Sequence, residues 1–131
     1  MLVHFPVGLL VSGSLFELYG KLGRDETVAV AGWFNVRLGF WCALPVAVVG
    51  VLGLMSIEVK QEFRPFLSYH ILGAFLTLFV FLCVLLISRF RKGLVLNVLY
   101  YLFLLAGLVS ALGTGYFGSE LVHRFHLPQG Q

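Results

Sequence analysis

The segment from Phe66 to Ser88 reads FLSYHILGAFLTLFVFLCVLLIS and holds no Asp, Glu, Lys or Arg. A bilayer core of about 30 Å is crossed by about 20 helical residues, so this segment alone is long enough to span a membrane. The whole chain has the same character, because 60% of its 131 residues are hydrophobic and only 11% are charged. About a quarter of the residues of an ordinary soluble domain are charged. The surplus apolar surface is therefore expected to face lipid.

Three other apolar segments accompany this one, separated by short connections. We expect transmembrane helices at about residues 4–22, 34–57, 66–88 and 94–118, the last extended helically to about residue 127. Strands are excluded as spans because an open sheet edge in hydrocarbon leaves backbone groups unpaired. Short connections make consecutive helices antiparallel neighbours. The sequence thus predicts an all-α membrane protein, a single domain (1–131) folded as an up-and-down four-transmembrane-helix bundle.

The basic residues indicate orientation. One set of helix ends has three of them, and the other has six, namely Lys21, Arg24, Arg37, Arg89, Arg91 and Lys92. The positive-inside rule places the richer end in the cytoplasm. We therefore expect a multi-pass protein of the bacterial inner (plasma) membrane with both termini in the periplasm. The net charge of +3 forms no dense basic stripe, which argues against a nucleic-acid partner.

Glu17 is an acidic residue inside an apolar segment. It lies about one turn from the basic end of the first helix, and Arg37 enters the second helix at a similar depth. An ion pair between neighbouring helices lowers the cost of placing either charge in the membrane. We therefore expect Glu17 to pair with Arg37.

The four histidines all fall at the opposite end of the bundle. His4 precedes the first helix, His70 lies about one turn into the third, and His123 and His126 close the fourth. Ionisable residues at membrane depth often mark a site, although imidazole is also common at the membrane interface. In a four-helix ring the first and third helices are diagonal, so His4 and His70 are expected to face each other across the axis. Two such imidazoles are the axial ligands of a b-type haem, and we predict one haem b, or two.

The fourth helix adds small side chains at the depth of His70. Ser110, Thr114 and Gly118 belong to a row with four-residue spacing, and a neighbouring row is also small. Such a face admits a flat ligand such as a porphyrin, and we include these three residues in the expected cofactor site. Small residues at this spacing are also the ordinary means by which membrane helices pack closely.

Two other kinds of function remain open. A zinc or copper site needs several ligands, and His4, His70, His123 or His126 with Glu120 would supply them. The chain is otherwise a cofactor-free structural or assembly subunit whose small-residue face binds a partner helix. We expect the chain to act as an electron-transfer subunit of a complex more than as a stand-alone enzyme, because we recognise no substrate domain in its 131 residues.

Three motifs resemble a known family. Val3-His4-Phe5-Pro6-Val7-Gly8 opens the chain, Tyr69-His70-Ile71-Leu72-Gly73 opens the third span, and Gly115-Tyr116-Phe117-Gly118-Ser119-Glu120-Leu121-Val122 lies near the end. Together they resemble the small four-span bacterial membrane proteins grouped as domain of unknown function 2231.

The resemblance implies the four-helix fold and singles out His4, His70 and one terminal histidine. The chain departs from the family pattern in lacking an upstream His-Pro pair, in having Ser119 for a second glycine, and in having His123 where a tyrosine is usual. The choice between His123 and His126 as the terminal histidine is thus open. Members often occur with electron-transfer partners, which implies a b-type cytochrome subunit. Such a subunit would carry electrons at the periplasmic face between a periplasmic redox protein and quinone or another membrane subunit.

Overall fold

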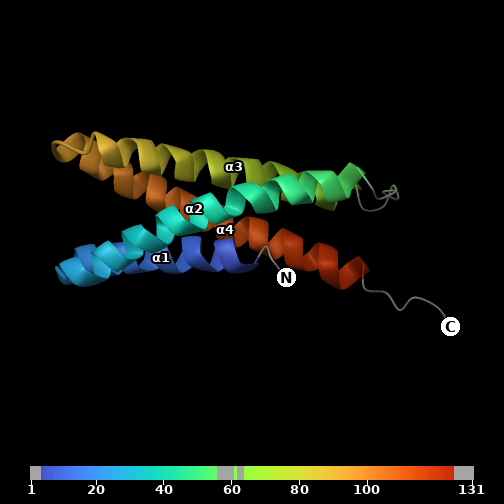
Figure 1. Ribbon diagram of the computed structural model, residues 1–131, viewed down its shortest axis with the longest axis horizontal. Coiled ribbons are helices and arrows are strands. Elements are labelled where there is room, and N and C mark those ends of the chain that lie inside the picture. Colours follow the sequence, from blue (N-terminus) through green and yellow to red (C-terminus); the bar gives the residue numbers. More distant parts are fainter. Residues whose placement is uncertain (1–3, 56–60, 62–63, 126–131) are drawn as a thin grey trace.

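The protein is a bundle of four long helices. The computed structural model describes residues 4–55, 61 and 64–125, and these form α1 (His4–Gly23), α2 (Glu26–Met55), α3 (Arg64–Arg89) and α4 (Leu94–Phe125) (Figure 1). No strand occurs among the described residues. The predicted all-α, four-helix class is therefore confirmed.

Three of these helices are long and apolar enough to cross a membrane. They are α2, α3 and α4, with α3 the most hydrophobic. The shorter α1 has Glu17 and Lys21 within its 20 residues, which lowers its average hydropathy below that of the other three. The membrane character predicted for the chain thus rests most firmly on the last three helices.

The two tight connections contain a helix cap and residues with left-handed backbone conformations. Only Arg24 and Asp25 separate α1 from α2, and Arg24 has a left-handed backbone (φ 55°). Asp25 Oδ1 accepts hydrogen bonds from the backbone N–H groups of Thr27 (3.0 Å) and Val28 (3.2 Å), which caps the start of α2. The second tight connection ends at Gly93, whose φ of 100° suits glycine.

Glycines set the close packing of α1 on α2. A Cβ atom built on Gly13 would lie 2.7 Å from the backbone nitrogen of Val36, and one on Gly32 would lie 2.5 Å from that of Glu17. The two backbones are therefore in direct contact at these points, as small residues permit between membrane helices. The pair forms one tightly packed hairpin.

The second hairpin consists of α3 and α4. A cluster of buried apolar side chains joins it to the first hairpin near the centre of the bundle: Leu10, Val36, Phe40, Phe81, Val84, Tyr100, Leu104 and Ala111. Contacts between hairpins run from α1 to α4 and from α2 to α3, so α1 and α3 are diagonal, as predicted.

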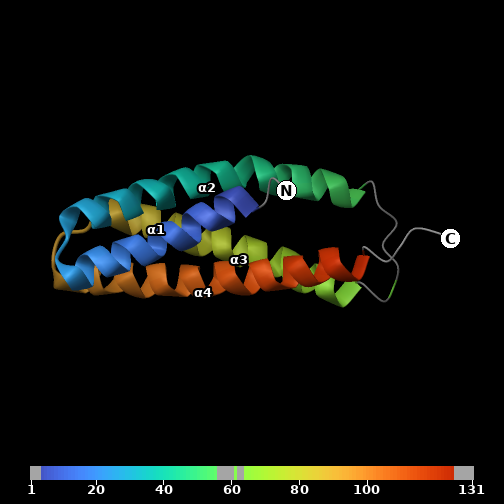
Figure 2. The same cartoon turned by 90° about the horizontal axis from the view of Figure 1, so that it is seen from below.

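The two hairpins are not parallel along their length. Figure 1 shows them moving apart toward the end that has the tight connections, and Figure 2 shows the far end of α2 standing away from α3 and α4. The buried contact between the hairpins is thus central. Many large apolar side chains are exposed on the outer faces, among them Phe34, Leu72 and Val109, and these are the surfaces that contact lipid.

Candidate functional site

His70 is held by α4 in a single ring orientation. Its Nδ1 lies 3.2 Å from the backbone carbonyl oxygen of Thr114. A carbonyl only accepts hydrogen bonds, so Nδ1 carries the proton and donates it. In the neutral ring this leaves the lone pair on Nε2. Metal-binding histidines are commonly fixed in this way, by a hydrogen bond from the nitrogen that does not bind the metal.

The imidazole also packs against Gly118. A Cβ atom on this glycine would lie 2.9 Å from Cε1 and 3.2 Å from Nδ1 of His70. The ring thus rests on the α4 backbone at a place where a larger residue would displace it. The predicted coincidence in depth between His70 and the small-residue face of α4 is confirmed.

Hydroxyl groups continue this contact toward the centre of the bundle. Thr77 lies seven residues after His70, on the same face of α3, and its hydroxyl donates to the carbonyl of Gly73 (2.8 Å). Its Oγ1 also lies 2.7 Å from Ser110 Oγ and 3.2 Å from Thr114 Oγ1. Thr114 likewise donates to the carbonyl of Ser110 (2.8 Å), so the Ser110 hydroxyl is the donor to Thr77 and this face presents few unpaired polar atoms.

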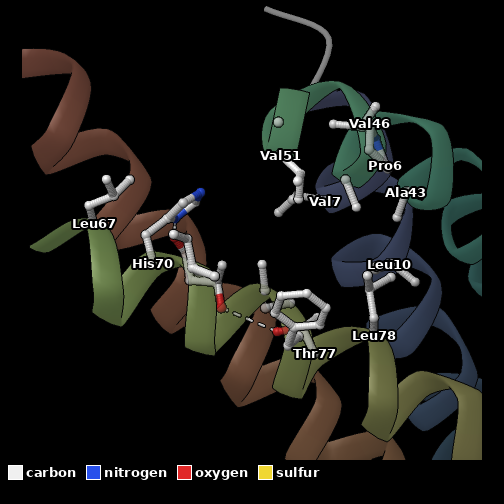
Figure 3. A pocket seen from close by; sticks show the side chains of 17 residues that line it. Pro6, Val7, Leu10, Ala43, Val46, Val51, Leu67, His70, Thr77 and Leu78 are labelled. Atoms are coloured by element: carbon white, nitrogen blue, oxygen red, sulfur yellow. Dashed lines mark hydrogen bonds between the residues drawn. The ribbon is translucent and has the colours of Figure 1, made fainter. Parts of the chain in front are cut away.

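A cavity of about 270 Å³ opens beside His70. Figure 3 shows His70 and Thr77 of α3 on one side of the space and Pro6, Val7 and Val51 on the other. The α2 wall is built largely from small or β-branched residues: Ala43, Val46, Ala47, Gly50 and Val51. The cavity is therefore almost entirely apolar, and His70 presents an imidazole at its edge.

Two of the other predicted histidines, His4 and His123, lie at the same end of the bundle but outside this cavity. His4 is exposed at the start of α1, one turn before Val7, which lines the cavity. His123 is exposed near the end of α4, and His126 lies outside the described residues. Within the described ranges, no three His, Cys, Asp or Glu side chains gather where they would hold a metal ion.

The predicted pairing of Glu17 with Arg37 is wrong. Glu17 lies 3.6 Å from Arg91, which follows α3, and both of its carboxylate oxygens accept the hydroxyl of Tyr100, at 2.5 and 2.6 Å. Arg37 instead stacks over the ring of Trp33 on its own helix, 5.8 Å from the centroid. The prediction failed because Glu17 of α1 faces α4, which belongs to the other hairpin, whereas the side chain of Arg37 on α2 is exposed and points away from Glu17.

Two features of the site were not predicted. The predicted site did not include Thr77, although a hydroxyl two turns after a histidine on an apolar helix indicates a polar face shared by the two residues. The group formed by Arg91, Tyr100 and Tyr101 was not predicted either. Arg91 lies in the connection between α3 and α4, whereas the two tyrosines lie on α4, so no single helix face contains all three. The spacing of Arg91, Asn97 and Tyr101 offered a signal for it, since Arg91 donates to Asn97 Oδ1 (2.7 Å) and to the Tyr101 hydroxyl (3.1 Å).

Comparison with known proteins identifies the family. The family model described as predicted membrane protein (DUF2231) matches residues 1–130. No curated protein and no solved structure matches the chain. The match covers nearly every residue and agrees with the four helices and their apolar surfaces. The chain therefore belongs to the DUF2231 family of membrane proteins.

Proposed function

We propose that the protein is a haem-binding electron-transfer subunit of the membrane, with His70 as an axial ligand. The observation that supports this most strongly is the hydrogen bond from His70 Nδ1 to the Thr114 carbonyl. It leaves Nε2 with its lone pair beside an apolar cavity. An imidazole presented in this manner is suited to coordinate iron.

The apolar walls of the cavity suit the ring of a haem. Small side chains on α2 leave room opposite His70, and the outer part of α2 stands away from α3 (Figure 2). Exclusion of water from such a site would hold a haem in a low dielectric, and a haem bound there would accept and release one electron at a time. The residues of the chain supply the ligand, its orientation and the apolar surroundings.

His4 is proposed as the second axial ligand. It lies on the same face of α1 as Val7, one helical turn earlier, and Val7 lines the cavity. The diagonal arrangement of α1 and α3 sets the two helices on opposite sides of the axis. A second haem, or a hydrogen bond to a propionate, is proposed for His123 or His126.

A zinc or copper centre is less well supported by the geometry. Zinc takes three or four protein ligands, and no group of that size is assembled among the described residues. A haem needs only one or two imidazoles, which the arrangement at His70 can provide. The number of ligands required therefore favours a haem over a zinc or copper ion.

The remaining parts of the proposal concern location and partners. The six basic residues at the end with the tight connections support an orientation in a bacterial inner membrane with that end in the cytoplasm and His70 toward the periplasm. Electrons would then pass at the periplasmic face between a redox protein and quinone or another membrane subunit.

The proposal is tested by the reduced-minus-oxidised spectrum of His70→Gly. The parent protein, purified in mild detergent, should show the α-band of a low-spin b-type haem, and His70→Gly should lose it. Imidazole added to the variant should restore the band, because it can occupy the vacated space. A variant that keeps the parent band without imidazole contradicts the assignment of His70, and a parent chain without haem supports a cofactor-free structural subunit instead.

A further inference from the structure

A second cavity lies at the opposite end of the bundle, between the two hairpins. Its volume is about 290 Å³, and its polar walls come from all parts of the fold: Glu17, Trp33, Ser88, Arg91, Tyr100 and Tyr101. The cavity is found where the hairpins move apart in Figure 1. Its place beside the helix ends puts it at the depth of lipid head groups.

The Glu17 carboxylate, which accepts hydrogen bonds in this cavity, already has partners within the protein. Tyr100 donates to both oxygens of Glu17, and Arg91 provides the opposite charge. Only about 5% of the Glu17 side chain is exposed. The carboxylate therefore has little capacity left for another ligand.

The remaining hydrogen-bonding groups are donors. The Tyr101 oxygen accepts from Arg91, so its own O–H is available to another partner. The indole N–H of Trp33 makes no hydrogen bond with the described part of the chain, although its ring lines the cavity. Arg91 Nη1 forms an ion pair with Glu17 at 3.6 Å, but about 30% of the Arg91 side chain is exposed, so part of the guanidinium is open to another ligand.

The local charge is also positive. Lys21 Nζ lies 6.0 Å from the Tyr101 ring centroid, and Arg91 keeps about 30% of its side chain exposed. The helix ends around the cavity have six basic residues against three acidic ones, Glu17, Asp25 and Glu26. A ligand that accepts hydrogen bonds and bears negative charge matches these walls.

We propose that the second cavity binds the phosphate of an anionic phospholipid. Tyr101, Trp33 and Arg91 would donate to the phosphate oxygens, with Lys21 adding charge. Basic pockets between membrane helices commonly receive such head groups. The acyl chains would leave along the apolar outer faces, where residues such as Val30 are exposed to lipid. The lipid would fill the space between the hairpins that protein side chains leave open.

The two tryptophans of the chain permit a selective test. Trp33 lines the cavity, whereas Trp41 lies on α2 about 12 Å farther along the axis and is exposed. The chain with Trp41→Phe reports Trp33 fluorescence, and the chain with Trp33→Phe reports Trp41. Each is titrated in neutral detergent with brominated phosphatidylglycerol or brominated phosphatidylcholine, whose bromines quench tryptophan on contact.

Phosphatidylglycerol should quench Trp33 at a roughly fivefold lower mole fraction than phosphatidylcholine, the factor that one cation contributes near an anionic lipid surface. Trp41 should show no such preference. In the Trp33 reporter chain, Tyr101→Phe and Lys21→Gln should each weaken the preference. Tyr116→Phe, an exposed tyrosine on the same helix as Tyr101, should leave it unchanged.

Three results would overturn the proposal. Equal quenching of Trp33 by both lipids removes the head-group selectivity, and an equal preference at Trp41 reduces it to a general attraction of anionic lipid. Loss of the preference in millimolar inorganic phosphate, but not in sodium chloride of the same ionic strength, shows that free phosphate binds the cavity in place of the lipid. None of these results depends on haem binding, so this inference and the proposed function are tested separately.

Discussion

Replacement of Gly118 by alanine tests whether the orientation of His70 matters for cofactor binding. The added Cβ would lie 2.9 Å from Cε1 and 3.2 Å from Nδ1 of His70, whereas carbon atoms in favourable contact lie about 3.5 Å apart or more. The ring must therefore retreat from α4 by about 0.6 Å. Its 3.2 Å hydrogen bond to the Thr114 carbonyl would lengthen beyond bonding distance.

Gly118→Ala should destabilise the site around His70 in two ways. Overpacking a well-fitted site costs about 1–3 kcal/mol, and the lost hydrogen bond adds about 1 kcal/mol. Loss of a partner that orients a metal-bound histidine typically lowers affinity 10- to 100-fold. We therefore expect Gly118→Ala to bind haem roughly 10- to 100-fold more weakly than the parent.

Titration of haem-depleted protein with haemin measures this affinity directly. The matched control is Gly113→Ala on the same helix, because a Cβ there meets no atom within 4 Å. The control should bind haem as the parent does. If Gly118→Ala binds haem with parental affinity, the hydrogen bond to Thr114 does not orient a ligand and the reasoning fails.

Two further predictions concern the hairpins. Gly32→Ala places a Cβ 2.5 Å from the backbone nitrogen of Glu17 and should lower the free energy of unfolding in detergent by about 3 kcal/mol. Gly53→Ala on the same helix, with open space around it, should not lower it, and equal stability of the two variants would contradict the close α1–α2 contact. Arg91→Gln should destabilise the protein by about 2 kcal/mol, less than the roughly 3 to 5 kcal/mol for a fully buried pair, because Arg91 is partly exposed. The exposed Arg89→Gln is its control, and adding Glu17→Gln to Arg91→Gln should recover part of the loss in the same unfolding assay. A double variant no more stable than Arg91→Gln would show that Glu17 and Arg91 are not coupled.

Much of the fold was predictable because the membrane imposes it. Hydrophobic length located the four helices, and the short connections made consecutive helices neighbours. The start of α2 at Glu26 was less clear, since its first turns are not strongly apolar. The cap at Asp25 explains that start, and such a cap depends on local backbone geometry.

Side-chain partners were harder to predict than helices. The depth of Glu17 correctly indicated a need for a partner, but two cations lay within reach of that depth. Rotation of α1 about its axis decided between Arg37 and Arg91, and this rotation is set by the glycine contacts with α2. His70 shows the opposite case, because the small residues of α4 marked the face against which it packs.

The proposal of a haem-binding subunit is tested most directly by the haem content of the purified chain. The protein should be produced in a host supplied with haem precursor and assayed as the pyridine haemochrome, with iron, zinc and copper measured on the same sample. We predict at least one haem b for each polypeptide, with iron in the same ratio. A chain that is folded and membrane-extracted, yet has no haem and no iron, would contradict the proposal.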